Sequence, residues 1–410
     1  MTIAVPGVPA SRKTPGVAFN VILGGVGTSA GDAPVSIMLL GNKTAAVSVA
    51  SPTYAQAAGT ATVETVYTIA SSDDAATLFG LGSELHIMAL AAFAQQPNAA
   101  LFGCAVTDPA GTAASAVLTF ATSANAAGTV RLSLCGNIID VPVVNGDSAT
   151  TIAAAVCTYV NAVTSLPYYA QNSVGAVTFT AKNTGPRGNV LVVDAYFIAS
   201  GAVVPTRITT SPTASGFATT GAWSGTGTIG SEITLSLGAT QDTFANALLA
   251  IDARQYDRVA CSCIDSTNAV RVKNALVAQA APTIQILEQG VVPSVDTYEN
   301  GIIFAATMNS SRMQTAWHYA SALPPCAVAA QTAAGRVAGD GAIGGDLVGE
   351  ADDPAANLNG VQLATITVQR SVSDQPTATE IENALNNGLT PLAPSSTRPG
   401  FVEIVKSITT

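Results

Sequence analysis

The chain has 410 residues, of which 10% are charged and 48% are hydrophobic, and its formal net charge is −10. Its 16 Lys and Arg residues are scattered, which argues against direct nucleic-acid binding because phosphate neutralisation needs clustered positive charge. The charged fraction is far below the roughly 25% of an ordinary soluble domain. Since no stretch is suited to cross a membrane, this composition favours a subunit whose outer faces contact other protein.

The first residues of the chain predict an extended arm. Positive charge at Arg12 and Lys13 follows the apolar residues instead of preceding them, which is the reverse of a secretory signal. Prolines disfavour a helix before residue 16, and residues 17–23 then alternate as in a strand. The segment is either an edge strand of its own domain or an arm that pairs with a neighbouring molecule. Its candidate inter-subunit residues are Val17, Phe19, Val21 and Leu23.

A strand and a helix follow in the next hundred residues. Residues 37–41 predict a strand, and a helix begins near Ser83 and ends at Pro97. Asp73 and Asp74 could form a paired-carboxylate site, but Asp is favoured where a helix begins. We therefore interpret this pair as helix-starting residues.

Residues 111–223 are rich in Thr, Ala, Gly and Val and predict a separate module. Asp147 and Ser148 are typical of a helix start, and the predicted helix passes through Ile152, Val156 and Tyr159. Strand patterns occupy residues 129–134, 138–144, 176–181 and 190–193. The order of these elements is β-β-α-β-β.

After residue 231 helices and strands alternate. Predicted helices cover 243–251 and 268–279, and predicted strands cover 258–264, 282–287 and 301–307. Thr377 and Glu380 form a capping-box pattern, Gly388 ends that helix, and residues 401–408 predict a closing strand. The predicted fold class is therefore α+β or α/β and multidomain: a layered mixed-sheet core with an inserted β-β-α-β-β domain and an extended N-terminal arm.

The cysteines and histidines do not predict a metal centre. The chain has six cysteines, no CxxC pair and two histidines. Cys261 and Cys263 lie in a strand-like segment, so both thiols would point to one face. We interpret the cysteines as small buried residues of a reducing compartment, with a redox or metal role as the alternative.

Three further patterns resemble active-site motifs. Residues 339–344 match the letters of a dinucleotide-binding loop, but a helix-like segment precedes them where that motif needs a strand. His86 and His318 would have to serve any nucleophile relay, yet each has apolar neighbours in a helix-like segment. The acidic run 349–353 lacks the ligand spacing of a calcium loop. We therefore expect no catalytic residue, metal ligand or cofactor, and no enzyme.

Several segments point to a known family when they are taken in order. On the N-terminal side these are residues 14–19, 37–41 and 78–83, and near the C-terminus they are 352–360, 381–392 and 402–410. Together they resemble the contractile tail sheath proteins of Mu-like bacteriophages, and the terminal block is the most specific part. The segments 128–132, 146–149 and 185–189 resemble a domain inserted in these sheaths.

The resemblance implies a mechanical role. Identical subunits would form stacked rings of a helical sheath around the tail tube protein, between the baseplate and tail terminator proteins. Contraction would drive the tube through the host envelope for genome delivery. The expected location is the virion tail after assembly in the bacterial host cytoplasm, without direct contact to nucleic acid or insertion into a membrane. By position, Val17, Phe19, Val21 and Leu23 match the family's arm, which adds strands to a neighbouring subunit.

The resemblance also implies a domain division. Residues 1–30 would form the arm and linker strand, 31–110 with 224–410 a discontinuous core, and 111–223 an inserted, outward-facing domain. Related sheaths continue after the closing strand into a C-terminal domain that faces the tube, and the sequence to Thr410 contains no match to that domain. Two expectations stay open: whether the chain is a fragment, and whether it assembles as given.

Two alternative functions remain. The chain could be the sheath of a tailocin or other contractile injection system, which would lack a capsid. It could also be a surface-layer or adhesin-type structural protein, which a secretion signal would favour.

Overall fold

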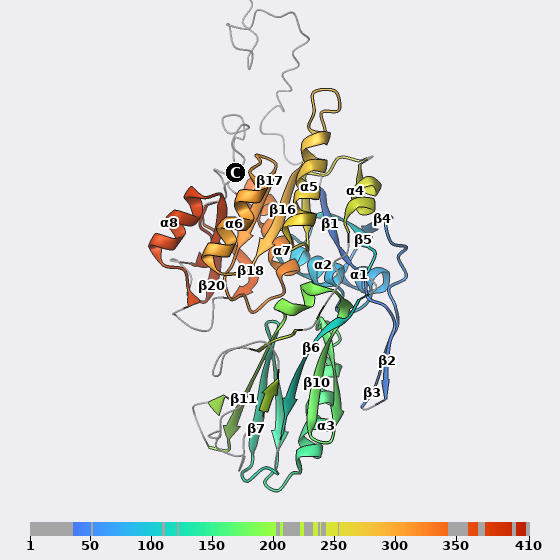
Figure 1. Cartoon of the computed structure of the whole chain (residues 1–410), viewed down its shortest axis with the longest axis vertical. Coiled ribbons are helices and arrows are strands. Elements are labelled where there is room, and N and C mark those ends of the chain that lie inside the picture. Colours follow the sequence, from blue (N-terminus) through green and yellow to red (C-terminus); the bar gives the residue numbers. More distant parts are fainter. Residues whose placement is uncertain are drawn as a thin grey trace, which may run out of the picture. The chain divides into compact units, whose positions relative to one another are not determined.

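The computed structural model describes residues 36–50, 52–108, 111–120, 123–201, 206–207, 222–224, 233–236, 238, 243–252, 254–342, 360–367, 374–395 and 399–406. All of them belong to one compact unit, Val35–Thr410. Within this unit a central mixed sheet carries helices on both faces, and an inserted module contains two smaller antiparallel sheets (Figure 1).

The central sheet has nine strands. Their order is β18 (Val361–Thr367), β20 (Phe401–Ile404), β19 (Leu389–Pro394), β17 (Met313–Trp317), β16 (Gln289–Ser294), β15 (Arg258–Cys261), β1 (Ser36–Asn42), β5 (Ala100–Val106) and β4 (Val66–Ile69). From β19 to β5 every neighbouring pair is parallel. The outer strands β18, β20 and β4 are antiparallel to their neighbours, so the sheet is mixed, as predicted.

Helices cover both faces of this sheet, which is why its central strands are apolar throughout. Ile37 and Leu39 of β1 face one cluster, Met38 and Leu40 face the other, and all four are fully buried. One face carries α1 (Ser72–Phe79), α2 (Glu84–Gln95) and α7 (Pro325–Ala342); the other carries α4 (Ala245–Ile251), α5 (Ser266–Gln279), α6 (Tyr298–Met308) and α8 (Ala378–Asn386). The sheet is therefore the middle layer of three.

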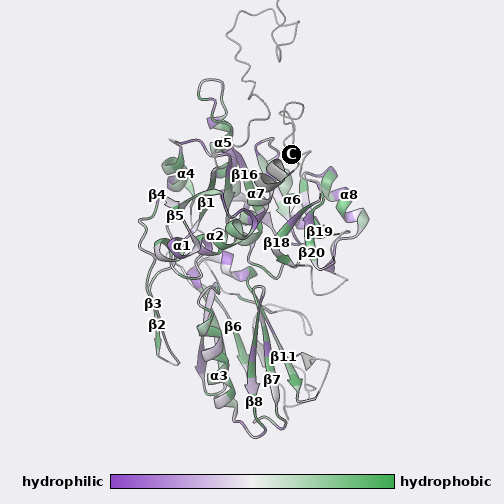
Figure 2. Cartoon of the chain, turned by 180° about the vertical axis from the view of Figure 1, so that it is seen from behind, coloured by the Kyte–Doolittle hydropathy of each residue, from purple (hydrophilic) through white to green (hydrophobic). Residues whose placement is uncertain are grey.

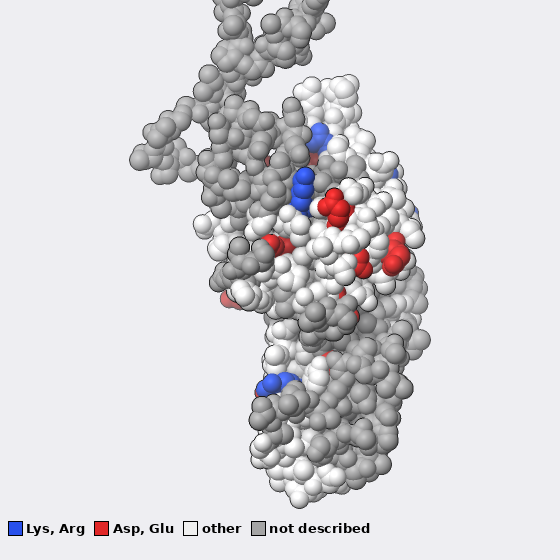
Figure 3. All heavy atoms as spheres, turned by 90° about the vertical axis from the view of Figure 1, so that its left-hand side faces the viewer, with Lys and Arg blue, Asp and Glu red and all other residues white. Residues whose placement is uncertain are grey.

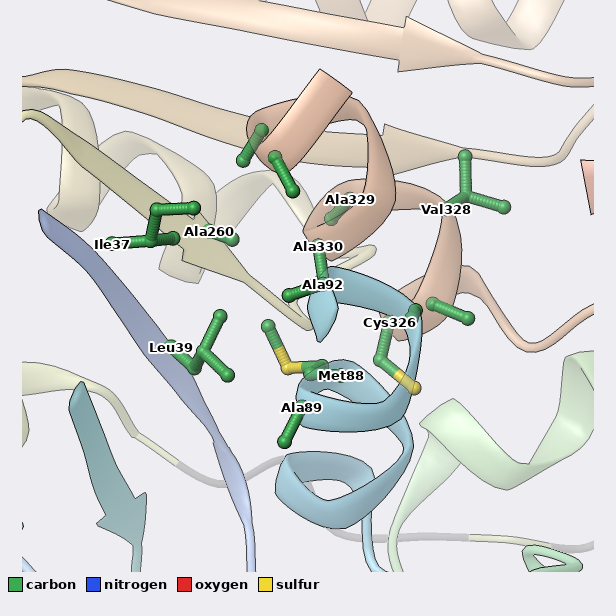
Figure 4. Close-up of a cluster of buried hydrophobic side chains, with 14 of the residues drawn as sticks. Ile37, Leu39, Met88, Ala89, Ala92, Ala260, Cys326, Val328, Ala329 and Ala330 are labelled. Carbon is green, nitrogen blue, oxygen red and sulfur yellow. The ribbon is translucent and has the colours of Figure 1, made fainter. Parts of the chain in front are cut away.

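The helices α2 and α7 pack against each other through small side chains. Figure 4 shows Ala92 of α2 beside Ala330 of α7, with Met88 and Cys326 in the same cluster. Alanine leaves little bulk between the two helix axes, so the helices approach closely. The seam is mostly apolar, and the buried Gln331 of α7 donates to Ala91 O of α2 across it at 3.4 Å.

The module is built from alternating strands. The strand order of its first sheet is β13 (Ala222–Ser224), β6 (Ala113–Thr119), β10 (Ala176–Thr184) and β9 (Tyr168–Ser173). The strand order of its second sheet is β12 (Thr206–Arg207), β11 (Val192–Ala199), β7 (Gly128–Leu134) and β8 (Asn137–Val143), and β14 (Ile233–Thr234) also pairs with β11. Helix α3 (Ala149–Ala162) packs on β8, β9 and β10, and the 3-10 helix η1 (Pro186–Val190) follows β10. Hydrophobic and hydrophilic residues alternate along these strands (Figure 2). A separate hairpin joins β2 (Val47–Ala50) and β3 (Thr53–Gln56).

Most of the predicted elements are present in the structure. The strand 37–41, the helix after Ser83 and the module strands 129–134, 138–144 and 176–181 are confirmed. The predicted strand 190–193 overlaps β11 only from Val192 onward, and β6 and β9 were not predicted. The Ser148 side chain caps α3 by accepting from Thr151 N. The capping box of Thr377 and Glu380 is present at α8, and Ser71 caps α1 with Asp73 and Asp74 in its first turn.

Three predictions are wrong. Residues 301–307 lie inside α6, because an apolar run of this length also fits a helix and Thr297 supplies an N-cap. Residues 282–287 form no strand; β16 begins later, at Gln289. The strand β16 was not predicted because it contains Pro293, which normally argues against a central strand. Proline is tolerated at this position because the pairing of β15 with β16 ends at Val291. His318 follows β17 and is not in a helix.

The six cysteines are free and buried, as predicted. Within the described ranges no cluster of three or more His, Cys, Asp or Glu residues could hold a metal ion. In the same part of the chain, no helix combines the length and apolar character needed to span a membrane.

Candidate functional site: a joint at the carboxyl ends of the central strands

The carboxyl ends of β1 and β15 lie where the strand connections diverge. The chain leaves β1 toward α1 and α2 on one face, and it leaves β15 toward α5 on the other face. In open α/β sheets, ligands bind in the crevice at this switch point. Asn42 ends β1, Ser262 follows β15 directly, and Asp108 lies just beyond β5. This is the first place to examine for function.

Glu84 ties the two strand ends together. Ser83 caps α2 by accepting from His86 N at 3.0 Å, which places Glu84 in the first turn, where a carboxylate is favoured. One oxygen, Oε2, accepts from Asn42 N at 3.0 Å and from Ser262 Oγ at 2.7 Å. The carboxylate thus binds β1 and β15 at once and leaves its other oxygen for a partner.

That partner comes from the module. Arg187 lies in η1, and its Nε donates to Glu84 Oε1 at 2.8 Å. Its Nη2 donates to Asn42 Oδ1 at 2.5 Å, and its guanidinium lies 5.4 Å from the centre of the Phe244 ring. Arg187 is only 8% exposed. A module side chain therefore occupies the crevice of the central sheet.

Asp108 extends this network. It accepts hydrogen bonds from Asn42 Nδ2 and from Asn183 Nδ2, the latter at 3.1 Å. Asn183 Nδ2 also donates to Lys43 O at 2.7 Å. Burial raises the pKa of Asp108 to about 6, although both amide hydrogen bonds act in the opposite direction. The carboxyl group titrates in a mildly acidic range.

A second contact lies beside the first. Lys182 Nζ donates to Leu81 O at 3.0 Å and to Thr164 O at 2.7 Å, and burial lowers the pKa of Lys182 to about 7. Gly82 has φ +72°, and a Cβ there would lie 2.1 Å from Leu166 O. Glycine is required because the core loop and the module backbone touch at this point. We call the joint the set Asn42, Gly82, Glu84, Asp108, Lys182, Asn183, Arg187 and Ser262.

Little space remains in the crevice. The cavity at the joint has a volume of about 30 Å³ and is lined by Glu84, Arg187, Ser262 and Cys326 among others. A single water needs roughly 10–15 Å³ of such volume. The cavity therefore holds one or two waters, and a substrate would have to displace Arg187. Chemically, the arrangement fixes two parts of the chain to each other.

The sequence-predicted residues lie in different places. The arm residues Val17, Phe19, Val21 and Leu23 lie outside the described residues, as does the acidic run 349–353. Residues 339–342 continue α7, so the dinucleotide-like letters form no strand-to-helix turn there.

Both histidines are buried. His86 Nδ1 accepts from Gly82 N at 3.0 Å, so its ring supports the loop before α2. His318, 1% exposed, follows β17 and takes no part in the joint. Burial lowers the pKa of both His86 and His318 to about 4, so both rings are neutral near pH 7.

Sequence reasoning missed the joint. Its residues come from segments far apart in the sequence, 145 positions for the Arg187–Asn42 bond and 178 for the Ser262–Glu84 bond, and no local pattern links them. The best available signal was the segment 185–189, where Gly and Pro flank a single Arg in a charge-poor module. That pattern predicts a turn but gives no partner.

Comparison with known proteins gives a distant likeness. No protein-family model matches the chain, and no curated protein matches it. Two solved structures are similar: a sheath tail protein from Desulfitobacterium hafniense (14% identity, TM-score 0.40, covering 95% of this chain and 74% of that one) and a sheath tail protein from Listeria innocua (14% identity, TM-score 0.38, covering 90% and 68%). At this level of superposition the likeness alone carries no functional conclusion.

Proposed function

We propose that the chain is the structural subunit of a contractile phage tail sheath. Identical copies polymerise around a tail tube, and contraction drives the tube through the host envelope for genome delivery. The subunit is not an enzyme and uses no cofactor. Contraction draws its work from the difference in contact free energy between two packings of the same subunits.

The observation that carries this proposal is the occupied crevice. The place where an α/β sheet offers a ligand site is filled by Arg187 of the module, which is paired with Glu84 and leaves a cavity of about 30 Å³. A catalyst would keep this place open. A mechanical subunit benefits from closing it, because the buried pair transmits force between module and sheet without a hinge.

The surface and the sequence support the same function. On the described part of the face in Figure 3, the Lys, Arg, Asp and Glu side chains are separated by uncharged residues. Such a surface suits extensive contact with other copies of the chain. The segments 37–41 and 381–392, which resemble phage sheath proteins, fold as β1 and as the α8–β19 unit of the central sheet. The resemblance therefore concerns the core of the fold.

Within the sheath, the parts have different roles. The N-terminal segment with Val17, Phe19, Val21 and Leu23 acts as the inter-subunit arm. The module, residues 111–223 by the sequence division, faces outward. Tube, baseplate and tail terminator proteins contact the assembled sheath. The tailocin sheath shares every one of these features except the capsid of the finished particle.

Negative-stain electron microscopy of the purified chain at high concentration tests the proposal. We expect hollow, striated tubes of uniform width. A chain lacking residues 1–30 is the matched variant: it should keep its circular dichroism spectrum and form no tubes. Monodisperse particles from the full chain, at every concentration and with a tail tube protein added, would contradict the proposal.

A further inference from the structure

A second cavity, which we call the β17 cavity, lies at the carboxyl end of β17. Its volume is about 190 Å³, several times the 30 Å³ of the cavity at the joint. Its walls come from the start of α6, the end of β17 and the segment that leads into α8, and α6 packs against α8 (Figure 1). A protein cavity of about 150 Å³ admits benzene. The β17 cavity therefore has room for the end of a large side chain.

Aromatic rings form part of its lining. Tyr298 of α6 and Trp317 at the end of β17 have ring centres 6.0 Å apart, with their planes at 65°. Trp317 Nε1 donates to Asp296 O at 3.0 Å, which fixes the orientation of the indole ring. Tyr319 follows β17 and also lines the cavity. Because the faces of aromatic rings carry partial negative charge, such a lining favours a cation.

Three carboxylates line the same cavity: Glu299, Asp374 and Glu380. Glu299 and Glu380 lie in the first turns of α6 and α8, where acidic residues are favoured. Each helix start is equivalent to only about +0.5 charge, so two of them do not neutralise three carboxylates. Among the described residues, no Lys or Arg lines the cavity, and none of these three carboxylates is in an ion pair. The cavity thus lacks a positive partner within the described chain.

The joint shows which group such a combination binds. There the Nε of Arg187 donates to the Glu84 carboxylate at 2.8 Å, and the guanidinium lies 5.4 Å from the centre of the Phe244 ring. Arg254 likewise places its guanidinium 4.8 Å from the centre of the Phe102 ring. The β17 cavity offers the same two kinds of group, carboxylate and aromatic ring, at the carboxyl end of another parallel strand. It differs from the joint in that no arginine of the described chain lines it.

We propose that the β17 cavity binds an arginine side chain presented by another protein chain. This inference goes beyond the proposed function and does not depend on it. A planar guanidinium can stack on a ring and donate two hydrogen bonds to a carboxylate, whereas the ammonium group of lysine is a compact point charge. The described lining has no positive group to bind the carboxylate of a free amino acid. The main chain of the occupant therefore stays outside the cavity, in its own protein.

The test measures binding of small probes to the full-length chain by isothermal titration calorimetry at low salt. The main probe is N-acetyl-arginine methylamide, which mimics an arginine within a polypeptide. Its lysine counterpart keeps the charge without the planar group, and its citrulline counterpart keeps the shape without the charge. Butylguanidine carries the charged group without main-chain amides and represents a small free cation.

Two variants, Glu299→Gln and Asp374→Asn, each remove one charge from the lining. Glu382→Gln is the matched control, because it removes the same charge from an exposed position of α8 that does not line the cavity. Glu380 stays unchanged, since its Oε2 accepts from Thr377 N at 2.7 Å and caps α8. Circular dichroism establishes that each variant is folded.

We expect the arginine probe to bind in the millimolar range, about threefold more tightly than the lysine probe and about tenfold more tightly than the citrulline probe. Butylguanidine should bind about as tightly as the arginine probe. Each lining variant should lower the affinity for the arginine probe about three- to fivefold, as for a charge pair at a partly exposed site, and Glu382→Gln should leave it unchanged.

Four calorimetric results overturn the inference: no binding of the arginine probe, equal binding of the arginine and citrulline probes, unchanged affinity in both lining variants, and equal weakening by all three variants. Binding of butylguanidine more than about tenfold tighter than the arginine probe also overturns it, because the cavity would then exclude a main chain and serve a free cation.

Fluorescence of Trp317 locates the bound probe. Trp223 is the only other tryptophan of the sequence, so in a Trp223→Phe chain the emission reports on the β17 cavity. We expect the arginine probe to change this emission with the same concentration dependence as the calorimetric signal. Heat of binding without a change in Trp317 emission would place the probe elsewhere and overturn the inference. Both readouts apply whether or not the chain forms tubes, so failure of the sheath proposal leaves this test intact.

Discussion

Two arginine–carboxylate pairs among the described residues differ in their hydrogen-bond geometry and in their exposure to water. Arg131 and Asp140 lie across β7 and β8 of the module and form a two-bond pair, with Nε–Oδ1 and Nη2–Oδ2 distances of 2.7 Å, and their side chains are 39% and 45% exposed. Arg187 Nε donates to Glu84 Oε1 at 2.8 Å, and those side chains are 8% and 15% exposed. The exposed pair has two short parallel hydrogen bonds, whereas the buried pair is less accessible to water.

The comparison teaches that burial decides what each pair does. Water screens the exposed charges and can replace either partner. At the joint there is room for only one or two waters, so removal of one charge leaves the other buried and poorly compensated. The exposed pair therefore sets the local register of two strands, while the buried pair determines whether module and core remain joined.

The largest effect is expected from Arg187→Met. Glu84 keeps its bonds from Asn42 N and Ser262 Oγ but loses its counter-charge, and we expect the free energy of unfolding to fall by about 3–5 kcal/mol. Urea denaturation followed by circular dichroism measures it. In the double variant Arg187→Met/Glu84→Gln the buried charge is gone, so most of the loss should be recovered. No recovery would mean that packing, and not charge, holds the joint.

Local patterns explain what the sequence could predict. Alternation in the module strands and the caps at Ser148 and Thr377 act over a few residues, so they were found. The central sheet is buried on both faces, so its strands lack alternation, and the run 301–307 could not be told from a helix. The joint depends on side chains that only the folded chain brings together, as with Glu84 and Arg187.

The second prediction separates contact from backbone conformation at the joint. Gly82 and Gly146 both have positive φ, at +72° and +93°, but only Gly82 touches another segment. Gly146→Ala should cost about 1–2 kcal/mol for the left-handed backbone alone. Gly82→Ala adds displacement of Leu166 O and should cost about 2–4 kcal/mol. Equal losses in the two variants, measured by urea denaturation, would show that the joint adjusts freely.

The third prediction concerns the pH dependence of stability. Asp108 at the joint and Asp140 of the exposed pair should change the free energy of unfolding with opposite sign as pH rises. The pKa of Asp108 is raised from 3.8 to about 6, so the folded chain binds its proton more tightly than the unfolded chain does. Its contribution is complete below about pH 3.8 and is lost as pH rises to about 6. The hydrogen bond from Arg131 lowers the pKa of Asp140, so that contribution is present at neutral pH and is lost in acid.

Unfolding free energies of wild type, Asp108→Asn and Asp140→Asn between pH 3 and 7 check these signs. Relative to Asp108→Asn, wild type should lose stability between about pH 4 and 6. Relative to Asp140→Asn, it should gain stability as pH rises from 3. Parallel curves for wild type and Asp108→Asn would mean that the joint is open enough for water to solvate Asp108.

The smallest effect is expected from Asp140→Asn at neutral pH. This change removes both charged hydrogen bonds of the exposed pair, yet the amide and Arg131 are left in contact with water. We expect the free energy of unfolding to fall by less than about 1 kcal/mol, and this difference to shrink in high salt. Arg131→Met is the control, since it removes the partner and keeps most of the strand's apolar contact. If Asp140→Asn destabilised the chain as much as Arg187→Met does, hydrogen-bond geometry would matter more for stability than burial. The stability of the joint would then come from its hydrogen bonds and not from the exclusion of water.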